Sequence, residues 1–166
     1  MKAEPLTAER SLLLLRGNEA GLVSLTRDQP ARRLKTRPQP EEWSPQDVLA
    51  HLRACSDVWG GNIGRILAEE HATFQGVNPR TWIGRTDYPE WPFERAIRAF
   101  SKQRGTLLRT LRGLSPKDWE RTASVISYGQ LSFERSVRSY ASQLARHERT
   151  HVRQIEQALA PSAAPR

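Results

Sequence analysis

The sequence predicts an all-α protein built as a four-helix bundle. Four stretches of the chain repeat apolar residues at helical spacing, and no stretch between them shows a convincing strand pattern. Amphipathic helices without a sheet bury their apolar faces against one another, and this favours a bundle. We expect a single domain over residues 1–166, with an ordered core over about 7–159.

The first helix is expected from about Thr7 to Arg27, where leucines provide the apolar face. A linker from Pro30 to Pro40 follows and is rich in proline and arginine. It cannot be helical throughout, because proline removes a backbone hydrogen bond and clashes with the preceding turn.

The second helix has the clearest start. Ser44 is a natural N-cap, Pro45 suits the first turn, and Asp47 lies three residues after the cap. We expect this helix to continue to about Glu70. Its apolar face carries His51 at one edge, beside Val48, Leu52, Cys55, Trp59 and Ile66.

Two further helices follow. The connection from His71 to Pro92 is too rich in glycine and proline to be one helix, and long connections of this kind are often functional. The third helix is expected from Phe93 to a stop at Gly113, and the fourth from about Ser132 to about Leu159. The buried faces predicted for these two helices are Phe93, Ile97, Phe100, Leu107 and Leu111, and Val137, Tyr140, Leu144, Ile155 and Leu159.

Composition excludes some classes of protein. The longest unbroken apolar run is Leu12 to Leu15, which is too short to span a bilayer. The first ten residues lack the apolar core of an export signal, and the lone Cys55 cannot form an internal disulfide. We therefore expect a cytoplasmic protein that does not enter a membrane.

The net charge of +8 is almost entirely arginine, with 22 arginines among the 26 basic residues. A basic surface can bind nucleic acid through its phosphates. Here the basic residues are scattered, without a long block or interleaved aromatic residues, so a nucleic-acid-binding module is the weaker reading.

His147 and His151 are the strongest candidates for a functional site. Histidines four apart on a helix project from one side, so both imidazoles can reach a single metal ion. The alternative is a surface pair near the helix C-terminus, where positive charge is mildly favourable. His51 on the inward edge of the second helix favours the metal site, whereas we expect His71 to be solvated or at most to contact substrate.

The distance of each histidine from the end of its helix tests whether His51 can reach the other two. His51 lies about 10 Å from the start of its helix, and His147 and His151 lie about 12–18 Å from the end of theirs. These levels match only if the second and fourth helices are antiparallel. That pairing requires up-down-down-up order, with the connection 71–92 as a long crossover between parallel second and third helices.

The segment from His147 to His151 also matches the H-E-x-x-H signature of zinc peptidases, in which the glutamate is the general base. A zincin needs a third ligand well downstream, yet only 15 residues follow His151. No edge strand is predicted to hold a peptide. A zincin-type peptidase is therefore disfavoured.

Glu148 falls on the buried face of the fourth helix, as Arg104 does on the third. The structural interpretation is a buried ion pair, since an unpaired buried charge is costly. The functional alternative makes Glu148 an outer-shell orienter of a ligand, or a base beside the metal. We favour the ion pair.

The motifs together resemble the DinB-like superfamily, which includes the YfiT group of proposed metal-dependent hydrolases. The resemblance covers nearly the whole chain. It rests on three segments, which are Glu42-Trp43-Ser44-Pro45 ahead of the helix with His51, Leu114-Ser115-Pro116 with Trp119, and His147 to Ile155.

The resemblance implies a bundle of the same up-down-down-up order, with His51, His147 and His151 as ligands of a divalent metal ion, zinc or nickel. It also implies a homodimer that acts on a small-molecule substrate. Relatives include thiol S-transferases and isomerases that use a bacterial thiol such as bacillithiol or mycothiol. Nothing in the resemblance suggests DNA binding.

Three histidines leave coordination positions open, as in catalytic metal sites. A metal held this way can lower the pKa of water for hydrolysis or bind a thiol as thiolate. The sequence therefore leaves two classes open, a metal-dependent hydrolase or thiol S-transferase, and a non-catalytic bundle in which the metal only joins two helices.

Overall fold

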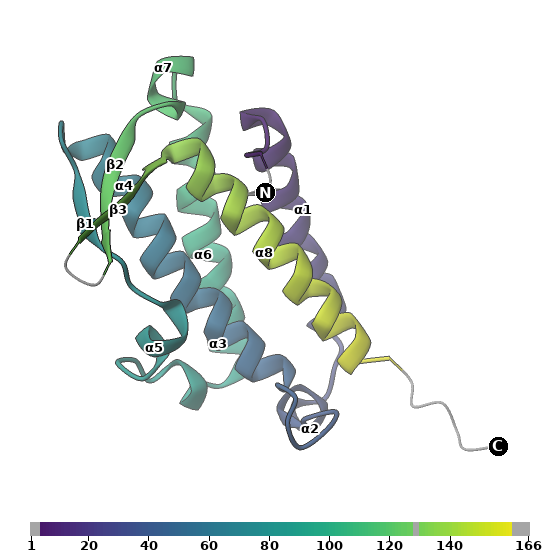
Figure 1. Cartoon of the computed structure of the whole chain (residues 1–166). Helices are drawn as coiled ribbons and strands as arrows, with labels where there is room; N and C mark the ends of the chain where they lie inside the picture. The colour runs from purple at the N-terminus through teal and green to yellow at the C-terminus, as the bar shows by residue number, and fades with distance from the viewer. Residues whose placement is uncertain (1–3, 128–129, 161–166) are drawn as a thin grey trace.

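The computed structural model describes residues 4–127 and 130–160, which form four long helical segments and a small sheet (Figure 1). Our single-domain assignment also includes residues 1–3, 128–129 and 161–166, which lie outside the described part. The elements in chain order are α1 (Ala8–Thr26), α2 (Ala31–Lys35), α3 (Pro45–Cys55), α4 (Gly61–Ala68), β1 (Thr73–Gln75), α5 (Pro79–Ile83), α6 (Phe93–Arg112), α7 (Pro116–Trp119), β2 (Thr122–Ser127), β3 (Gln130–Ser136) and α8 (Val137–Ala158).

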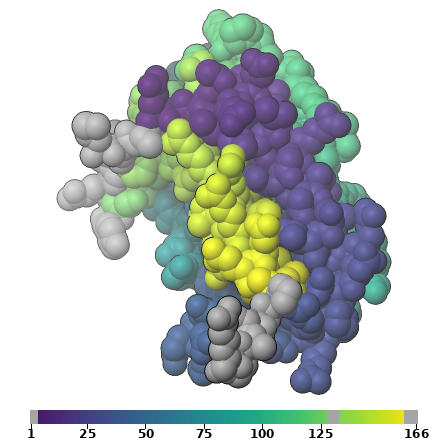
Figure 2. All heavy atoms as spheres, turned by 90° about the vertical axis from the view of Figure 1, so that its right-hand side faces the viewer, coloured from purple at the N-terminus to yellow at the C-terminus, as the bar shows by residue number. Residues whose placement is uncertain are grey.

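The first and last helices of the bundle run parallel, side by side (Figures 1 and 2). Just before α1 the Leu6 N–H donates to the Ser142 hydroxyl at 3.0 Å, and further along α1 the Asn18 side-chain amide donates to the Ala145 carbonyl at 2.8 Å. Contacts therefore advance along both segments in the same direction. Asn18 is buried, so this bond also satisfies polar groups inside the interface.

The helix formed by α3 and α4 runs antiparallel to α8 and parallel to α6 (Figure 1). Near its start His51 meets His147, and further along the Asn62 amide donates to the Tyr140 hydroxyl at 3.1 Å. The residue numbers of successive contacts thus rise along the first helix and fall along α8, as expected for antiparallel helices. The predicted up-down-down-up bundle is confirmed.

A π-helical turn, Ser56–Gly60, joins α3 to α4, so that one continuous helix covers the predicted second helix. Its start is the predicted one: the Ser44 hydroxyl accepts from the Asp47 backbone N–H, and the Asp47 carboxylate accepts from the Ser44 N–H. This reciprocal capping box fixes where α3 begins. It thereby fixes the level of His51, seven residues later.

The expectation of a chain without strands was wrong. In the described residues β2 pairs parallel with β1 and antiparallel with β3, with an irregularity between Val125 and Ile126. Alternate β2 residues, Ala123 and Val125, are buried, together with Phe74 of β1. The sheet buries these three side chains in the same core as α4 and α8, which is why the segment is extended.

The fourth helix begins at Val137 and not near Ser132, because residues 130–136 are engaged in pairing with β2. Ser136 is the actual N-cap, and its hydroxyl accepts from the Ser139 N–H. The other predicted helix ends are confirmed to within two residues, including the stop of α6 at Gly113.

The predicted apolar faces form the core, although Trp59, Ile97 and Leu107 are only partly buried. The crossover, rather than being a bare loop, contains β1, α5 and a 3-10 turn at Tyr88–Glu90. Within the described residues, no helix combines the length and the apolar character that crossing a bilayer requires.

Loss of the α3 cap is expected to destabilise the protein. Ser44→Ala removes a buried cap and should lower the free energy of unfolding by about 1 kcal/mol, measured by urea denaturation. Ser115→Ala is the matched control, because Ser115 makes the same capping box on the four-residue α7 but is exposed. Equal losses in the two variants would contradict a special role for the α3 cap.

Candidate metal centre

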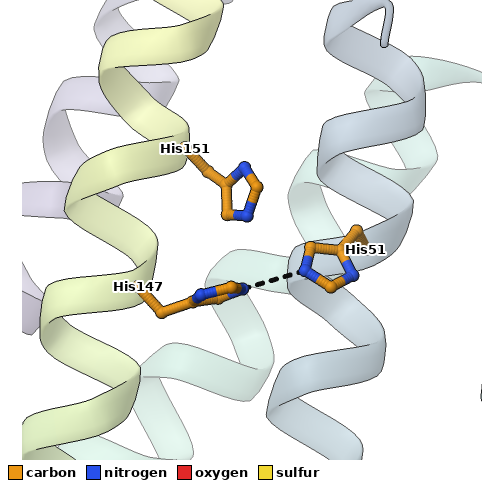
Figure 3. Close-up of side chains that lie close together, drawn as sticks. All are labelled: His51, His147 and His151. Atoms are coloured by element: carbon orange, nitrogen blue, oxygen red, sulfur yellow. Dashed lines mark hydrogen bonds between the residues drawn. The ribbon is translucent and has the colours of Figure 1, made fainter. Parts of the chain in front are cut away.

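Three histidines from two antiparallel helices converge inside the bundle. His51 comes from α3, and His147 and His151 come from successive turns of α8, with their rings pointing toward one another (Figure 3). The Nε2 atoms of His51 and His147 are 2.8 Å apart. One ring nitrogen of each of the three histidines lies within 4.8 Å of the others. The structure thus brings together all three residues singled out in the sequence.

Aromatic side chains surround the three imidazoles. The Trp43 ring stacks on His151 at a centroid distance of 6.1 Å and an interplanar angle of 15°, and it meets His51 edge-on at 5.1 Å. The Trp59 ring meets His147 edge-on at 5.1 Å. Sequence reasoning assigned Trp59 to the core and gave Trp43 no role at the site. These rings make the surroundings of the histidines largely apolar.

Gln154 fixes the tautomer of His151. The Nδ1 atom of His151 lies 2.8 Å from Oε1 of Gln154, one helical turn further along α8. An amide oxygen only accepts, so Nδ1 carries the proton and Nε2 keeps its lone pair. Partners of this kind orient metal-ligating histidines in proteins. The three-residue spacing on a helix was the signal available in the sequence.

The surroundings keep the imidazoles neutral. Burial, followed by repulsion from His151, His147 and Arg80, lowers the pKa of His51 from 6.5 to about 3. Burial, His151 and Arg80 lower the pKa of His147 to about 4. Burial also lowers the pKa of His151, although its bond to Gln154 acts in the opposite direction. At neutral pH each ring therefore offers a lone pair.

Arg80, in α5 on the crossover, brings a positive charge to this site. Its guanidinium carbon lies 5.1 Å from the centroid of the Trp43 ring, which itself lies against two of the histidines. Arg80 is exposed, whereas His51 is buried, so the charge lies on the solvent side. Sequence reasoning missed this residue because nothing in a broken loop indicates where one arginine will lie.

Two further groups lie behind the histidines. Cys55 Sγ is 3.5 Å from His51 Nε2, and burial raises the pKa of this thiol to about 12. Glu148 forms a fully buried ion pair with Arg104, as we favoured. Among the described residues, no carboxylate joins the cluster of three histidines. His71 is exposed, lines a separate surface cavity and does not join the cluster.

The donor set fits a divalent transition metal. Two Nε2 atoms at 2.8 Å must share either one proton or one cation, and three neutral imidazoles are typical ligands of zinc, nickel, copper and iron. In addition, the buried Nδ1 of His51 has no partner among the described residues. The arrangement can hold a metal from one side and leave the side of Arg80 accessible.

Comparisons with known proteins agree with the observed fold. YfiT from Bacillus subtilis, described as a probable metal-dependent hydrolase with an unusual four-helix bundle topology, superposes with a TM-score of 0.73 at 14% identity, over 95% of this chain and 90% of YfiT. TT2238, a four-helix bundle protein, gives a TM-score of 0.62 at 17% identity, over 91% of this chain and 99% of TT2238. These likenesses concern the fold.

No curated protein sequence matches the chain. A sequence model of the DinB superfamily matches residues 14–155, a stretch that contains all four bundle helices in whole or in large part and all three clustered histidines. The chain belongs to the DinB superfamily.

Proposed function

We propose that this protein is a metal-dependent hydrolase of a small molecule, with His51, His147 and His151 as ligands of zinc or nickel. The observation that supports this most directly is the convergence of three neutral imidazoles at one level of the bundle. The description of YfiT as a probable metal-dependent hydrolase points the same way. Three protein ligands are the number found in hydrolytic zinc sites, which keep a further position open.

When bound, the metal supplies Lewis-acid activation of a water molecule. The chain's own residues prepare the rest. Gln154 holds His151 in one tautomer, while Trp43 and Trp59 limit the access of bulk water around the rings. The Arg80 guanidinium provides a fixed positive charge on the open side, where it attracts an anionic group of the substrate and stabilises negative charge that develops during reaction.

A thiol S-transferase is the second candidate, and one observation favours it. Hydrolysis usually employs a general base beside the metal, but no carboxylate of the described part of the chain belongs to the cluster, and Glu148 is paired with Arg104. A thiol bound to a metal is deprotonated outright and needs no separate base. A thiol transfer would therefore use the same three metal ligands and would not require a general base among the surrounding residues.

Activity assays on the metal-loaded protein separate the two reactions. A hydrolase is expected to cleave members of a panel of small anionic esters and amides, whereas a transferase is expected to join a low-molecular-weight thiol to an electrophile. In either case His147→Ala should reduce the rate at least roughly a hundredfold by removing a metal ligand. If the metal-loaded protein performs neither reaction, the non-catalytic bundle is the better account.

Metal content tests the ligands themselves. The wild-type chain is expected to bind one zinc or nickel ion, and His51→Ala or His147→Ala should weaken binding by roughly a hundredfold or more, measured by calorimetry and elemental analysis. His71→Ala is the matched control, because His71 is exposed and outside the cluster. Unchanged metal content in both cluster variants would rule out the proposed centre.

The lowered histidine pKa values predict how stability depends on pH. In the metal-free protein the unfolded chain takes up protons near pH 6.5, but folded His51 and His147 do so only near 3 and 4. Between these limits the unfolded state binds more protons, so the free energy of unfolding should fall as the pH falls below 6.5. Urea denaturation of the chelator-treated protein at pH 7, 6 and 5 measures this decline.

The double variant His51→Gln and His147→Gln should show a shallower decline over the same range, and His71→Gln should behave as the wild type. A decline as steep in the double variant as in the wild type would contradict the assignment of the pH dependence to the cluster.

A further inference from the structure

Two arginines are buried on the side of α3 that faces away from the three histidines. Arg53 follows His51 by two residues, which places the two side chains about 200° apart around the helix. Arg53 is 5% exposed, and Arg104 of α6 is 1% exposed. Fully buried guanidinium groups are rare unless each is matched by an acceptor.

A cavity of about 510 Å³ lies next to these arginines, between the helix formed by α3 and α4 and the parallel helix α6. The two arginines are lining residues, and the lining is mostly apolar, with Ile63, Ala99 and Leu107 among its residues. The volume is in the range of small-molecule sites. None of the three histidines lines it, so it is separate from the candidate metal centre.

Two glycines of the helix formed by α3 and α4 line the cavity. A Cβ atom added at Gly60 or Gly64 would meet no other atom within 4 Å, although both residues line the cavity. Glycine inside a helix is less stable than alanine by about 1 kcal/mol. The two residues therefore cost stability and leave a space where a side chain would fit.

The basic residues of the cavity lining outnumber the acidic ones among the described residues, and the acid that pairs with Arg104, Glu148, is outside the lining. Arg53, Lys102 and Arg104 line the cavity, and no aspartate or glutamate does. The Nη2 atom of Arg104 is engaged by Glu148 and Ser56, whereas its Nε and Nη1 have no hydrogen-bond partner among the described residues. Oε2 of Glu148 is also buried without a partner in the described chain, so the ion pair does not satisfy these two nitrogens, and buried donors without acceptors are costly.

Arg53 also has buried nitrogens without a hydrogen-bond partner in the described structure. Its guanidinium lies over the rings of Tyr88 and Trp91, at 3.7 and 4.1 Å from their centroids, which fixes its plane. In the described part of the chain its Nε and Nη1 have no acceptor. The nearby carboxylate of Asp57 already accepts from Tyr88, Trp82 and Gln103.

We propose that this cavity binds an amphipathic carboxylate, whose head group accepts hydrogen bonds from Arg53 and Arg104 and whose hydrocarbon body lies beside Gly60 and Gly64. A carboxylate matches the planar donor pattern of guanidinium, and the apolar walls match a hydrocarbon chain. The site is distinct from the metal centre and does not depend on the function proposed there.

Calorimetric titration of the full chain with decanoate, below its micelle concentration, tests the proposal. One decanoate is expected to bind per chain, and decanol, which has the same chain length without the charge, at least tenfold more weakly. Gly64→Leu fills the cavity and should weaken decanoate binding at least tenfold. Gly17→Leu is the matched control, since Gly17 is an exposed helical glycine with equal room for a side chain but lies in α1, away from the cavity.

His147→Ala is titrated in parallel and should bind decanoate as tightly as the wild type, which excludes coordination of the carboxylate to a metal. Thermal melts monitored by circular dichroism show whether each variant folds. The proposal is overturned if decanoate does not bind, if decanol binds equally well, if folded Gly64→Leu binds like Gly17→Leu, or if His147→Ala abolishes binding. If Gly64→Leu does not fold, the comparison of decanoate with decanol on the wild type decides.

Discussion

The antiparallel packing of α3 against α8 is the constraint on which the candidate site depends. In that arrangement His51, near the start of α3, meets His147 at the middle of α8 and lies close to His151 one turn further on. In this bundle α3 and α6 run parallel, so the chain between them crosses from one end of the bundle to the other. That crossover carries Arg80, which is how a residue of the long connection comes to lie beside the histidines.

The buried ion pair of Arg104 and Glu148 explains why a peptidase-like signature lacks a peptidase-like site. Glu148 follows His147 directly, yet its carboxylate pairs with a guanidinium of α6 and does not join the imidazoles. Burial lowers the pKa of Arg104 to about 10, so the guanidinium stays charged at neutral pH. Removing either partner would leave an uncompensated buried charge. Glu148 therefore serves to pair α8 with α6.

Local signals in the sequence were sufficient for the four long helices, apart from the start of the fourth, and for the choice of three histidines that lie together. Ser44, Pro45 and Gly113 fix helix ends through backbone chemistry that depends on few neighbours. The sheet was missed because β1 has three residues and pairs with a strand some fifty positions away, which no local pattern records. The pairing of β2 with β3 is local, and the alternation of polar and apolar residues from Thr122 to Val125 was a usable signal for it. Trp43 and Arg80 reach the site through tertiary packing, which spacing along the chain does not encode.

The helix that begins after Ser44 contributes residues to both the histidine cluster and the arginine-lined cavity. One face presents His51 to α8, and the opposite face presents Arg53 to α6, so both regions depend on a single helix whose start is fixed by a capping box. The π-helical turn after Cys55 adds a residue to the helical repeat, and such turns are frequent at functional sites. This turn contains Ser56, whose hydroxyl accepts from Arg104, and Gly60, which lines the cavity. The π-helical turn thus contributes to both regions, because Gly60 lines the cavity and the Trp59 ring meets His147.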